Sequence, residues 1–289
     1  MAFSMIYRIT GTVLSWLALW TLLLPSVKAQ SLQVRHEHAD SRDTYFVELL
    51  ELVLQQTEAA YELIPREKGM VAARAFRQLS QGRDIDIVWS MTTSYRENEP
   101  NVYAIRVPLT QGLFGLRVLL INAADSAQFA QVELDELKTL AAGQGHDWAD
   151  TAILRSNGFS VETSTSYASL FRMLHYGRFA YMPRSVLEVW DEVATHTDKD
   201  LVIAPKWLLA YPAPIYFFVH EQNTELIRRL EEGLALAIAD GSFEAHFQQW
   251  FGEYVKRSGL HARQVVHLSN PLIPADSTLN IHRRWFNLP

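Results

Sequence analysis

One short segment of the sequence holds several side chains that are suited to binding a small anion. Three hydroxyl groups and one guanidinium group stand close together, on Thr92, Thr93, Ser94 and Arg96. A guanidinium group offers two parallel N–H groups that fit the two oxygens of a carboxylate, and hydroxyl groups add further hydrogen bonds. The segment therefore predicts an anion-binding loop. The alternative is a surface loop in which Arg96 pairs with Glu97 or Glu99.

Two other patterns are compatible with ligand binding but also have simpler explanations. Gly143-Gln144-Gly145, before a predicted helix start with Asp147 as N-cap, would present backbone N–H groups to an anion, or would be an ordinary turn. Aromatic residues near predicted strand ends would stack on a ligand, or would pack in the core. These residues are Tyr45, Trp89, Trp148, Tyr181 and Tyr211.

The motifs of common enzyme classes are absent from the sequence. It has no Gly-x-Ser-x-Gly elbow, no Gly-Lys-Ser/Thr phosphate loop and no His-Glu-x-x-His zinc motif. It has no cysteine, which excludes disulfide bonds, thiolate metal sites and a cysteine nucleophile. His36-Glu37-His38 resembles a metal-binding pair, but no partner carboxylate is identifiable, so we expect exposed polar residues there. We therefore expect no enzyme, no cofactor and no metal site.

The net charge of the chain argues against a nucleic-acid partner. Its 289 residues carry a formal charge of −6, and 48% of them are hydrophobic, as in a folded protein. Loss of the first 29 residues would remove two basic residues and no acidic one, which leaves −8 by the same count. No basic run is present that would neutralise phosphates. The partner that we expect is a small molecule.

The N-terminal segment has the pattern of a signal peptide for export. Arg8 precedes an almost unbroken apolar run from Val13 to Leu24, and Pro25 follows it. Val27-Lys28-Ala29 places small or aliphatic residues where a signal peptidase reads them. A membrane span needs about 20 apolar residues, and this run is shorter. We predict a signal peptide over residues 1–29 and export to the periplasm; the alternative is an uncleaved membrane anchor.

From residue 31 onward, strands and helices alternate in two successive units, which predicts an α/β protein with largely parallel sheets. The expected strands are 32–35, 61–64, 85–89, 115–121, 159–162, 179–182, 201–203 and 215–219. The expected helices are 45–56, 71–79, 134–140, 167–174, 186–193, 225–239 and 243–255. After Gly259 the sequence lacks clear periodicity, and we expect an extended arm packed on the surface.

Several segments, in this order, resemble the type II periplasmic solute-binding proteins of the amino-acid-binding kind (family 3). Residues 79–86 resemble the helix end and Gly-x-x-Asp strand before that family's binding loop, and Thr93-Ser94-Tyr95-Arg96 is similar to its Thr-x-x-Arg loop. Leu174-His175-Tyr176-Gly177-Arg178-Phe179 is similar to its Leu-x-x-Gly-Arg turn. Residues 220–226, 239–243 and 250–252 resemble the closing helices of that family. The piece 145–148 and the tail after Gly259 depart from the family pattern.

The resemblance implies a two-lobed periplasmic-binding-protein type II fold, in which two Rossmann-like lobes are joined by a two-strand hinge. Lobe 1 would hold residues 31–113 plus 215–289, and lobe 2 would hold residues 114–214. A small-molecule ligand would bind in the cleft between the lobes, which would close on it. The protein would be a monomer that delivers an amino-acid-like or dicarboxylate-like solute to an ABC transporter or a membrane sensor.

The second lobe departs from the family at one informative point. In the resembling proteins an acidic residue after the Gly-Arg turn binds the ammonium group of the ligand, whereas here that position falls on Arg184 or Ser185. An arginine would repel an ammonium group, so Arg96 and Arg184 together favour a more anionic ligand. The alternative for Arg184 is a solvated side chain or an ion pair with Glu188. The predicted ligand-binding set is Thr92, Thr93, Ser94, Arg96, Arg184, Ser185, Trp148 and Tyr45.

Two function classes besides a solute-binding protein stay open on the sequence. One is a secreted hydrolase of unknown type, and the other is a scaffold with this fold that has lost its ligand. A hydrolase would turn over a substrate, whereas a binding protein would only be stabilised by its ligand. A scaffold would do neither.

Overall fold

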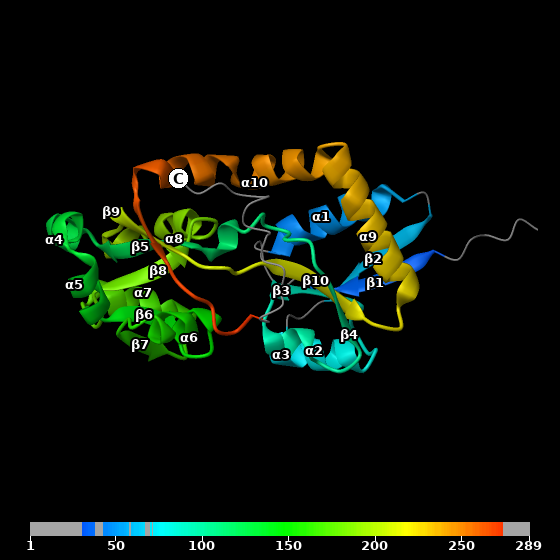
Figure 1. The fold of residues 1–289 in the computed structure, drawn as a ribbon, viewed down its shortest axis with the longest axis horizontal. Helices are drawn as coiled ribbons and strands as arrows, with labels where there is room; N and C mark the ends of the chain where they lie inside the picture. Colours follow the sequence, from blue (N-terminus) through cyan, green and yellow to red (C-terminus); the bar gives the residue numbers. More distant parts are fainter. Residues whose placement is uncertain (1–30, 38–42, 58, 67–69, 71, 274–289) are drawn as a thin grey trace, which may run out of the picture.

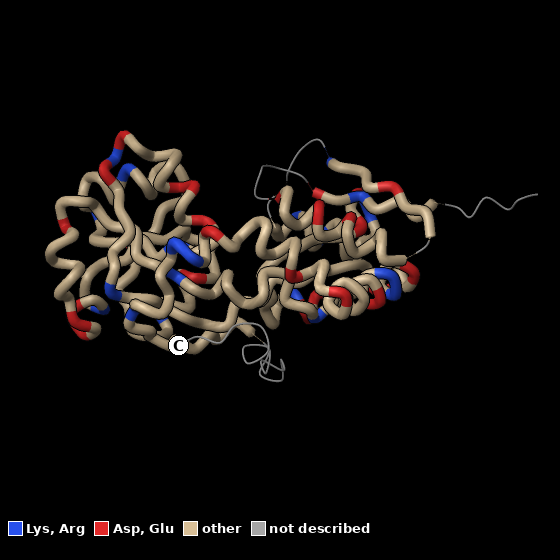
Figure 2. Tube along the Cα trace, turned by 90° about the horizontal axis from the view of Figure 1, so that it is seen from above, with Lys and Arg blue, Asp and Glu red and all other residues tan. Residues whose placement is uncertain are grey.

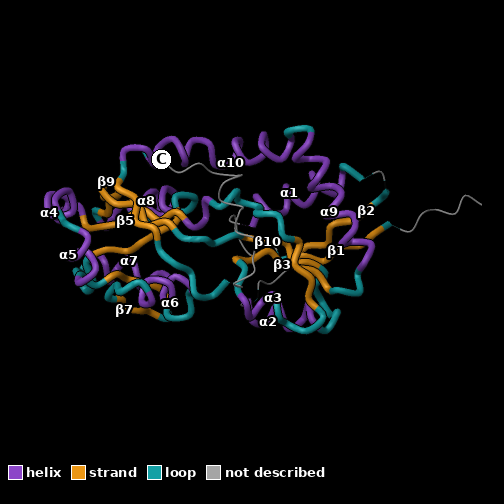
Figure 3. Tube along the Cα trace, in the orientation of Figure 1, coloured by secondary structure: helices purple, strands orange, loops and turns teal. Residues whose placement is uncertain are grey.

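The computed structural model describes residues 31–37, 43–57, 59–66, 70 and 72–273. Within them the chain forms two separate mixed β-sheets with helices packed around them, and the sheets lie at opposite ends of an elongated molecule (Figures 1 and 3). We call the part around each sheet the first lobe and the second lobe, in chain order. Acidic and basic residues are distributed over both lobes (Figure 2).

The first sheet has five strands in the order β2-β1-β3-β10-β4. Strand β1 pairs in parallel with β2 and β3, whereas β10 pairs antiparallel with β3 and β4. The strands are β1 (Leu32–His36), β2 (Tyr61–Pro65), β3 (Ile87–Met91), β4 (Val102–Ile105) and β10 (Ile215–His220). The helices of this lobe are α1 (Thr44–Gln55), α2 (Ala72–Ser80), α3 (Ser94–Glu97), α9 (Thr224–Ala239) and α10 (Ser242–Ser258).

Helix α1 forms because its apolar residues recur every three or four positions and share one face. The side chains of Leu49, Leu50 and Val53 on this face are fully buried. Helices α9 and α10 pack against α1. This packing places the N-terminal turn of α1, which carries Tyr45, beside α10.

The second sheet has six strands in the order β11-β9-β5-β8-β6-β7. Strand β6 pairs in parallel with β7 and β8, β5 pairs antiparallel with β8 and β9, and β11 pairs in parallel with β9. The strands are β5 (Leu116–Asn122), β6 (Ala142–Gly145), β7 (Val161–Ser164), β8 (Tyr181–Ser185), β9 (Leu201–Ala210) and β11 (Gln264–His267). The helices are α4 (Ser126–Gln131), α5 (Leu134–Thr139), α6 (Ala149–Ser156), α7 (Tyr167–His175) and α8 (Val189–Thr195).

The predicted turn at Gly143-Gln144-Gly145 was wrong, because these residues lie inside the buried strand β6. Their glycines permit close packing: a Cβ atom on Gly143 would lie 2.1 Å from the ring of Phe179. The predicted N-cap, Asp147, was also wrong by one position, because Trp148 is the N-cap of α6. The backbone N–H groups of this segment therefore belong to a sheet and do not form an anion-binding turn.

Within the described residues the chain passes between the two lobes four times, the last time through the segment that follows β11. Residues 106–115 lead from β4 to β5, and residues 211–214 lead from β9 back to β10. These two passages are the hinge connections. The third passage is α10, which begins beside the first sheet and ends beside the second (Figure 1).

Strand β11 follows α10 and adds to the edge of the second sheet. The sequence predicts residues 215–289 in the first lobe, and this short piece departs from that division. The physical reason is that the edge of β9 offers unpaired backbone N–H and C=O groups, which a passing extended segment satisfies.

After β11 the chain runs back toward the first lobe; we call residues 264–272 the C-terminal strap. In its middle, the N–H group of Ser269 donates to Oδ1 of Asn157 at 3.0 Å, and Nδ2 of Asn157 donates to the Ser269 carbonyl at 2.8 Å. Asn157 directly follows α6. This pair of hydrogen bonds holds the strap on the second lobe.

The end of the strap contacts a hinge connection and then the first lobe. Nδ2 of Asn270 donates to the Pro212 carbonyl at 2.7 Å. The N–H group of Ser94, in the first turn of α3, donates to the Leu272 carbonyl at 2.6 Å. The strap therefore spans both lobes and reaches the loop that the sequence predicted to bind an anion.

Among the described residues, no helix has both the length and the apolar character that a membrane span requires. The predicted signal peptide, residues 1–29, lies outside the described residues.

Candidate functional site

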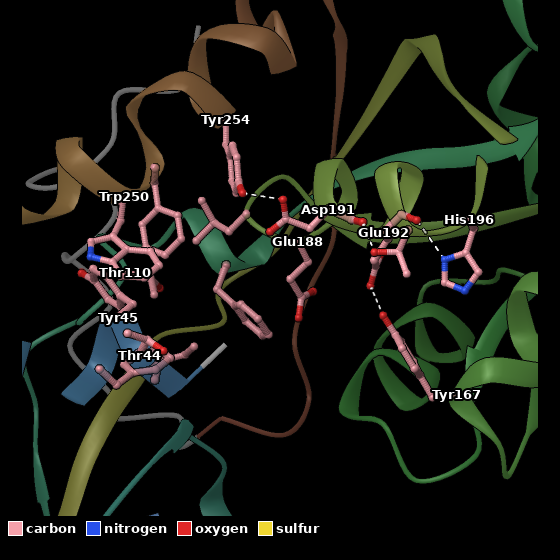
Figure 4. A pocket seen from close by; sticks show the side chains of 16 residues that line it. Thr44, Tyr45, Thr110, Tyr167, Glu188, Asp191, Glu192, His196, Trp250 and Tyr254 are labelled. Carbon is pink, nitrogen blue, oxygen red and sulfur yellow. Dashed lines mark hydrogen bonds between the residues drawn. The ribbon is translucent and has the colours of Figure 1, made fainter. Parts of the chain in front are cut away.

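A cavity of about 520 Å³ lies between the two lobes, with walls from both of them (Figure 4). The first lobe contributes residues from the start of α1 and from α10, and the second lobe contributes residues from around α8. Small-molecule sites in proteins usually have volumes of about 300–1,000 Å³. The cavity is therefore large enough for a ligand of amino-acid size.

The first-lobe wall of the cavity is mainly aromatic and comes from α1 and α10. Its rings belong to Tyr45, Phe46, Trp250, Phe251 and Tyr254. The hydroxyl group of Tyr45 donates to the Leu109 carbonyl at 2.5 Å, and its ring lies 4.6 Å from the ring of Phe251. The ring of His246, also on α10, stacks on the Tyr45 ring with 4.9 Å between the ring centres. These contacts fix the rings of α1 against those of α10.

The second-lobe wall of the cavity is acidic. Three carboxylates line it, and they lie at the start of α8: Glu188, Asp191 and Glu192. At the edge of the cavity, where the two walls meet, the Tyr254 hydroxyl donates to Oδ1 of Asp191 at 2.6 Å. The described residues that line the cavity include no lysine and no arginine. The wall is therefore better suited to a group that donates hydrogen bonds or carries positive charge than to an anion.

A buried ion-pair network lies behind the acidic wall. Nε of Arg184 donates to both carboxylate oxygens of Glu192 at 2.9 Å, and its Nη2 donates to Glu188 at 3.2 Å. The Tyr167 hydroxyl donates to Glu192 at 2.8 Å. Burial favours the neutral form of Glu192, but the Arg184 guanidinium outweighs it and holds the pKa of Glu192 below its ordinary value. Glu192 is therefore an ionised residue whose oxygens already have donors.

The same network extends to a hinge connection through Arg117 on β5. Nε of Arg117 lies 2.8 Å from Oδ1 of Asp150 and donates to the Tyr211 hydroxyl at 2.7 Å. The Tyr211 hydroxyl in turn donates to Asp150. Burial opposes the charge on Arg117, but Asp150, Tyr211 and Glu188 together outweigh burial and raise the pKa of the guanidinium. Because Tyr211 begins the second hinge connection, the network joins the hinge to the cavity wall.

The predicted anion-binding loop does not line this cavity. The Arg96 guanidinium donates to the Met91 carbonyl and lies 5.4 Å from the centre of the Phe76 ring on α2. Burial lowers the pKa of Arg96. Its predicted alternative partner, Glu97, pairs instead with Arg106 at 2.8 Å. The described structure thus shows Arg96 in a local packing role beside α2.

The two threonine hydroxyl groups of this loop, and the backbone N–H group of Ser94, also have partners outside the cavity. The Thr92 hydroxyl donates to Glu97 at 2.5 Å. The Thr93 hydroxyl accepts from the N–H group of Arg96 at 3.2 Å and so caps α3. The N–H group of Ser94 is bound by the C-terminal strap, as described above.

The predicted second-lobe residues lie behind the cavity wall. Arg184 is buried and forms the ion pair with Glu188 that the sequence allowed as an alternative, together with a second one to Glu192. Its guanidinium lies 4.7 Å from the ring centre of Trp148. Ser185 is fully buried, and its hydroxyl accepts from the N–H group of Leu187 at 3.3 Å. Of the predicted set, Tyr45 is the residue that lines the cavity.

Sequence reasoning missed most of the lining residues. Trp250 and Tyr254 lie in a helix that was predicted, but nothing in its periodicity indicates that one of its faces meets the second lobe. Glu188 was considered only as a partner of Arg184. The signal that was available is the spacing of Glu188 and Glu192, which lie four apart at the N-cap and in the first turn of α8 and therefore share one face of it.

No group of three or more metal-binding side chains gathers among the described residues. Of the possible histidine pair, His38 lies outside the described residues, and His36 is buried with its Nδ1 atom 2.8 Å from the Glu37 carbonyl oxygen. His36 therefore contradicts the expectation of an exposed polar residue. It lies beside Trp89, with 6.1 Å between the ring centres.

No protein-family model matches the sequence, and no curated protein matches it. Solved structures do match. The probable amino-acid ABC transporter extracellular-binding protein YtmK from Bacillus subtilis is 14% identical, with a TM-score of 0.60 over 78% of this chain and 99% of that one. An ancestral arginine-binding protein bound to glutamine is 16% identical, with a TM-score of 0.55 over 76% of this chain and 98% of that one.

A third similar structure is the periplasmic VFT2 domain of Bordetella pertussis BvgS, which is 17% identical, with a TM-score of 0.57 over 75% of this chain and 93% of that one. At such identities the likeness establishes the fold. The chain therefore has the two-lobed α/β fold of type II periplasmic binding proteins, as predicted. The similar structures cover about three quarters of this chain, and each is matched over nearly its full length.

Proposed function

We propose that this protein is an exported solute-binding protein that captures a small amino-acid-like molecule between its lobes. The observation that supports it is the interlobe cavity of about 520 Å³, with an aromatic wall from the first lobe and an acidic wall from the second. Because each lobe holds one wall, a ligand that contacts both would stabilise the closed arrangement of the lobes.

The lining of the cavity supports a zwitterionic solute over a purely anionic one. The sequence left both open, and Arg184 was the argument for the anionic ligand. Its guanidinium is already paired with Glu188 and Glu192. An α-amino acid would place its ammonium group against the acidic wall and an apolar side chain against Trp250 and Phe251.

Delivery to an ABC transporter or reporting to a membrane sensor would follow from capture. The similar structures include the extracellular-binding protein of a probable amino-acid ABC transporter and a periplasmic domain of BvgS. We further propose that residues 1–29 direct export to the periplasm. Cell fractionation followed by N-terminal sequencing tests this: a periplasmic chain that begins at Gln30 supports it, and an intact N-terminus on a membrane-bound chain contradicts it.

A thermal-shift screen of the purified protein tests capture. The probes are the common amino acids, small dicarboxylates and short peptides, with product analysis to detect turnover. A solute that binds the native state should raise the midpoint increasingly with its concentration, as mass action requires, and should be recovered unchanged. In Trp250→Ala the shift should shrink, whereas in Tyr176→Ala, whose ring is 73% exposed, it should persist. A flat response to every probe, or hydrolysis of one, would contradict the proposal.

A further inference from the structure

The acidic wall of the cavity has hydrogen-bond acceptors without donors. Oε2 of Glu188 accepts from Arg184, whereas no described residue donates to its Oε1 atom. Asp191 accepts one hydrogen bond, from Tyr254 on Oδ1. The Thr110 hydroxyl, which also lines the cavity, is 99% buried and has no partner among the described residues. A buried hydroxyl without a partner destabilises the protein, so a ligand group that bonds to it would recover that energy.

The charges around the cavity are not balanced within the described residues. Arg117 and Arg184 are the two cations of the buried network, and they face three carboxylates, on Asp150, Glu188 and Glu192. Asp191 adds a fourth carboxylate at the same wall. Arg257, whose guanidinium lies against the Trp190 ring and acts on Tyr254, is a third cation at this wall, so carboxylates outnumber guanidinium groups here by one. In a partly enclosed space, where water screens charges less than in bulk solvent, this excess attracts a cation.

The opposite wall offers a second kind of contact to a cation. The faces of aromatic rings carry negative charge density and attract an ammonium or guanidinium group within about 6 Å. The first-lobe wall presents Trp250, Phe251 and Tyr254, and Phe114 lies between the lobes. One cation already uses this environment, since the Arg117 guanidinium lies 4.5 Å from the centre of the Phe114 ring.

From these three features we infer that the solute is a small organic cation, or carries a cationic end, of the alkylammonium or guanidinium class. Its charged group lies between Glu188 and Asp191, and its apolar body lies against Trp250 and Phe251. This inference rests on the proposed function, because it names the ligand class of the same cavity. The sequence argument from Arg96 and Arg184 favoured an anionic ligand. The ligand inferred from the cavity has the opposite charge.

Isothermal titration calorimetry with matched probes tests the ligand class. Choline is compared with 3,3-dimethylbutan-1-ol, which has the same shape without the charge, and L-arginine and L-lysine are compared with L-glutamate and glutarate. We expect at least one cationic probe to bind about tenfold or more tightly than its uncharged or anionic counterpart. If L-glutamate binds and no cationic probe does, this inference is overturned while the proposed function stands; if glutarate alone binds, the zwitterionic solute is overturned as well. If no probe of either charge binds, the proposed function fails as well.

Two variants that remove one charge each locate the cationic group. Glu188→Gln and Asp191→Asn should each weaken binding of the cationic probe about tenfold and leave binding of an uncharged probe unchanged. Glu162→Gln, an exposed residue on β7 of the same lobe, is the matched control and should have no effect. Urea denaturation of each variant separates loss of binding from loss of folding. Unchanged binding in both cavity variants, with the fold intact, would overturn the inference.

Discussion

The hydroxyl group of Tyr254 on α10 donates a hydrogen bond of 2.6 Å to the carboxylate of Asp191 on α8, and this bond joins the two lobes at the edge of the cavity (Figure 4). A second contact lies close by, where the Arg257 guanidinium is 4.3 Å from the centre of the Trp190 ring. Helix α10 therefore does more than close the first lobe. It fixes the distance between the aromatic wall and the acidic wall.

The first prediction concerns this bond. Tyr254→Phe keeps the ring and removes the hydroxyl, so the free energy of unfolding should fall by about 1 kcal/mol, the net value of one hydrogen bond. Urea denaturation followed by tryptophan fluorescence measures the change. Tyr176→Phe, on an exposed ring of the second lobe, is the control and should leave the midpoint unchanged. Equal losses in both variants would show that the bond between the lobes is not the cause.

The second prediction concerns the buried ion pair between Arg184 and Glu192. Glu192→Gln leaves a buried guanidinium without its main partner, and we expect a loss of about 3–5 kcal/mol. The double variant Arg184→Met, Glu192→Leu removes both charges and should recover most of this loss. The reason is that a protein is often about as stable with a buried apolar pair as with a buried ion pair of similar size. Thermal and urea unfolding measure both. A double variant as unstable as the single one would contradict this account.

The third prediction concerns the hinge. A Cβ atom on Gly115 would lie 1.9 Å from the backbone oxygen of Tyr211, and neither backbone can move freely there. Gly115→Ala should therefore lower the unfolding free energy by roughly 3 kcal/mol or more. In the control, Gly252→Ala on α10, the nearest atom is the flexible end of Gln248 at 2.9 Å. That variant should gain stability, by up to about 1 kcal/mol, because alanine favours a helix. Tolerance of both changes would contradict the close approach at the hinge.

The fourth prediction concerns the C-terminal strap. Asn157→Ala removes three hydrogen bonds between its side chain and Ser269, so stability should fall by about 1–2 kcal/mol. Hydrogen exchange should also become faster at the Ser269 and Leu272 amides. Asn98→Ala, on an exposed residue, is the control. Loss of stability without faster exchange in the strap would place the effect elsewhere in the second lobe.

The fifth prediction concerns pH and His246. Burial lowers the pKa of His246, although its hydrogen bond to the Tyr45 carbonyl and the nearby Glu48 carboxylate act in the opposite direction. An unfolded histidine has a pKa of about 6.5, so the unfolded state takes up a proton first as the pH falls. Stability is thus complete above about pH 6.5 and declines below it, as the pH approaches the folded pKa.

The variant His246→Gln cannot titrate and keeps a side-chain donor. Between about pH 7.5 and pH 5.5 it should lose less stability than the wild type. Urea midpoints at several pH values measure this, and His261→Gln, on an exposed residue, is the control. An identical pH dependence in wild type and His246→Gln would contradict the role of burial.

Most of the fold could be predicted because its elements are set locally. The helix expected over 225–239 is α9 (Thr224–Ala239), whose N-cap Asn223 accepts from the N–H group of Leu226 at 3.3 Å. Strand β11 could not be predicted, because its four residues carry no periodicity. Its pairing depends on the edge of β9, more than fifty positions earlier in the chain.

The site could be predicted only in part, for a similar reason. Tyr45 was predicted and lines the cavity, whereas the partners of Arg96 depend on α2 and on the return of the C-terminal strap. The acidic wall was missed because a helix pattern shows which residues share a face but not what that face meets. Only the position of α10 across both lobes makes Asp191 a lining residue.

The insertion of β10 between β3 and β4 has a consequence for how the chain is made. Synthesis runs from the N-terminus, so the second sheet receives five of its six strands before residue 215 appears. Synthesis of the first sheet is thus interrupted by most of the second, and the edge of β3 must wait for a partner that is more than 120 residues away in the sequence. At roughly 5–20 residues per second, this wait lasts about 6–25 s, during which that edge is open to pairing with other chains.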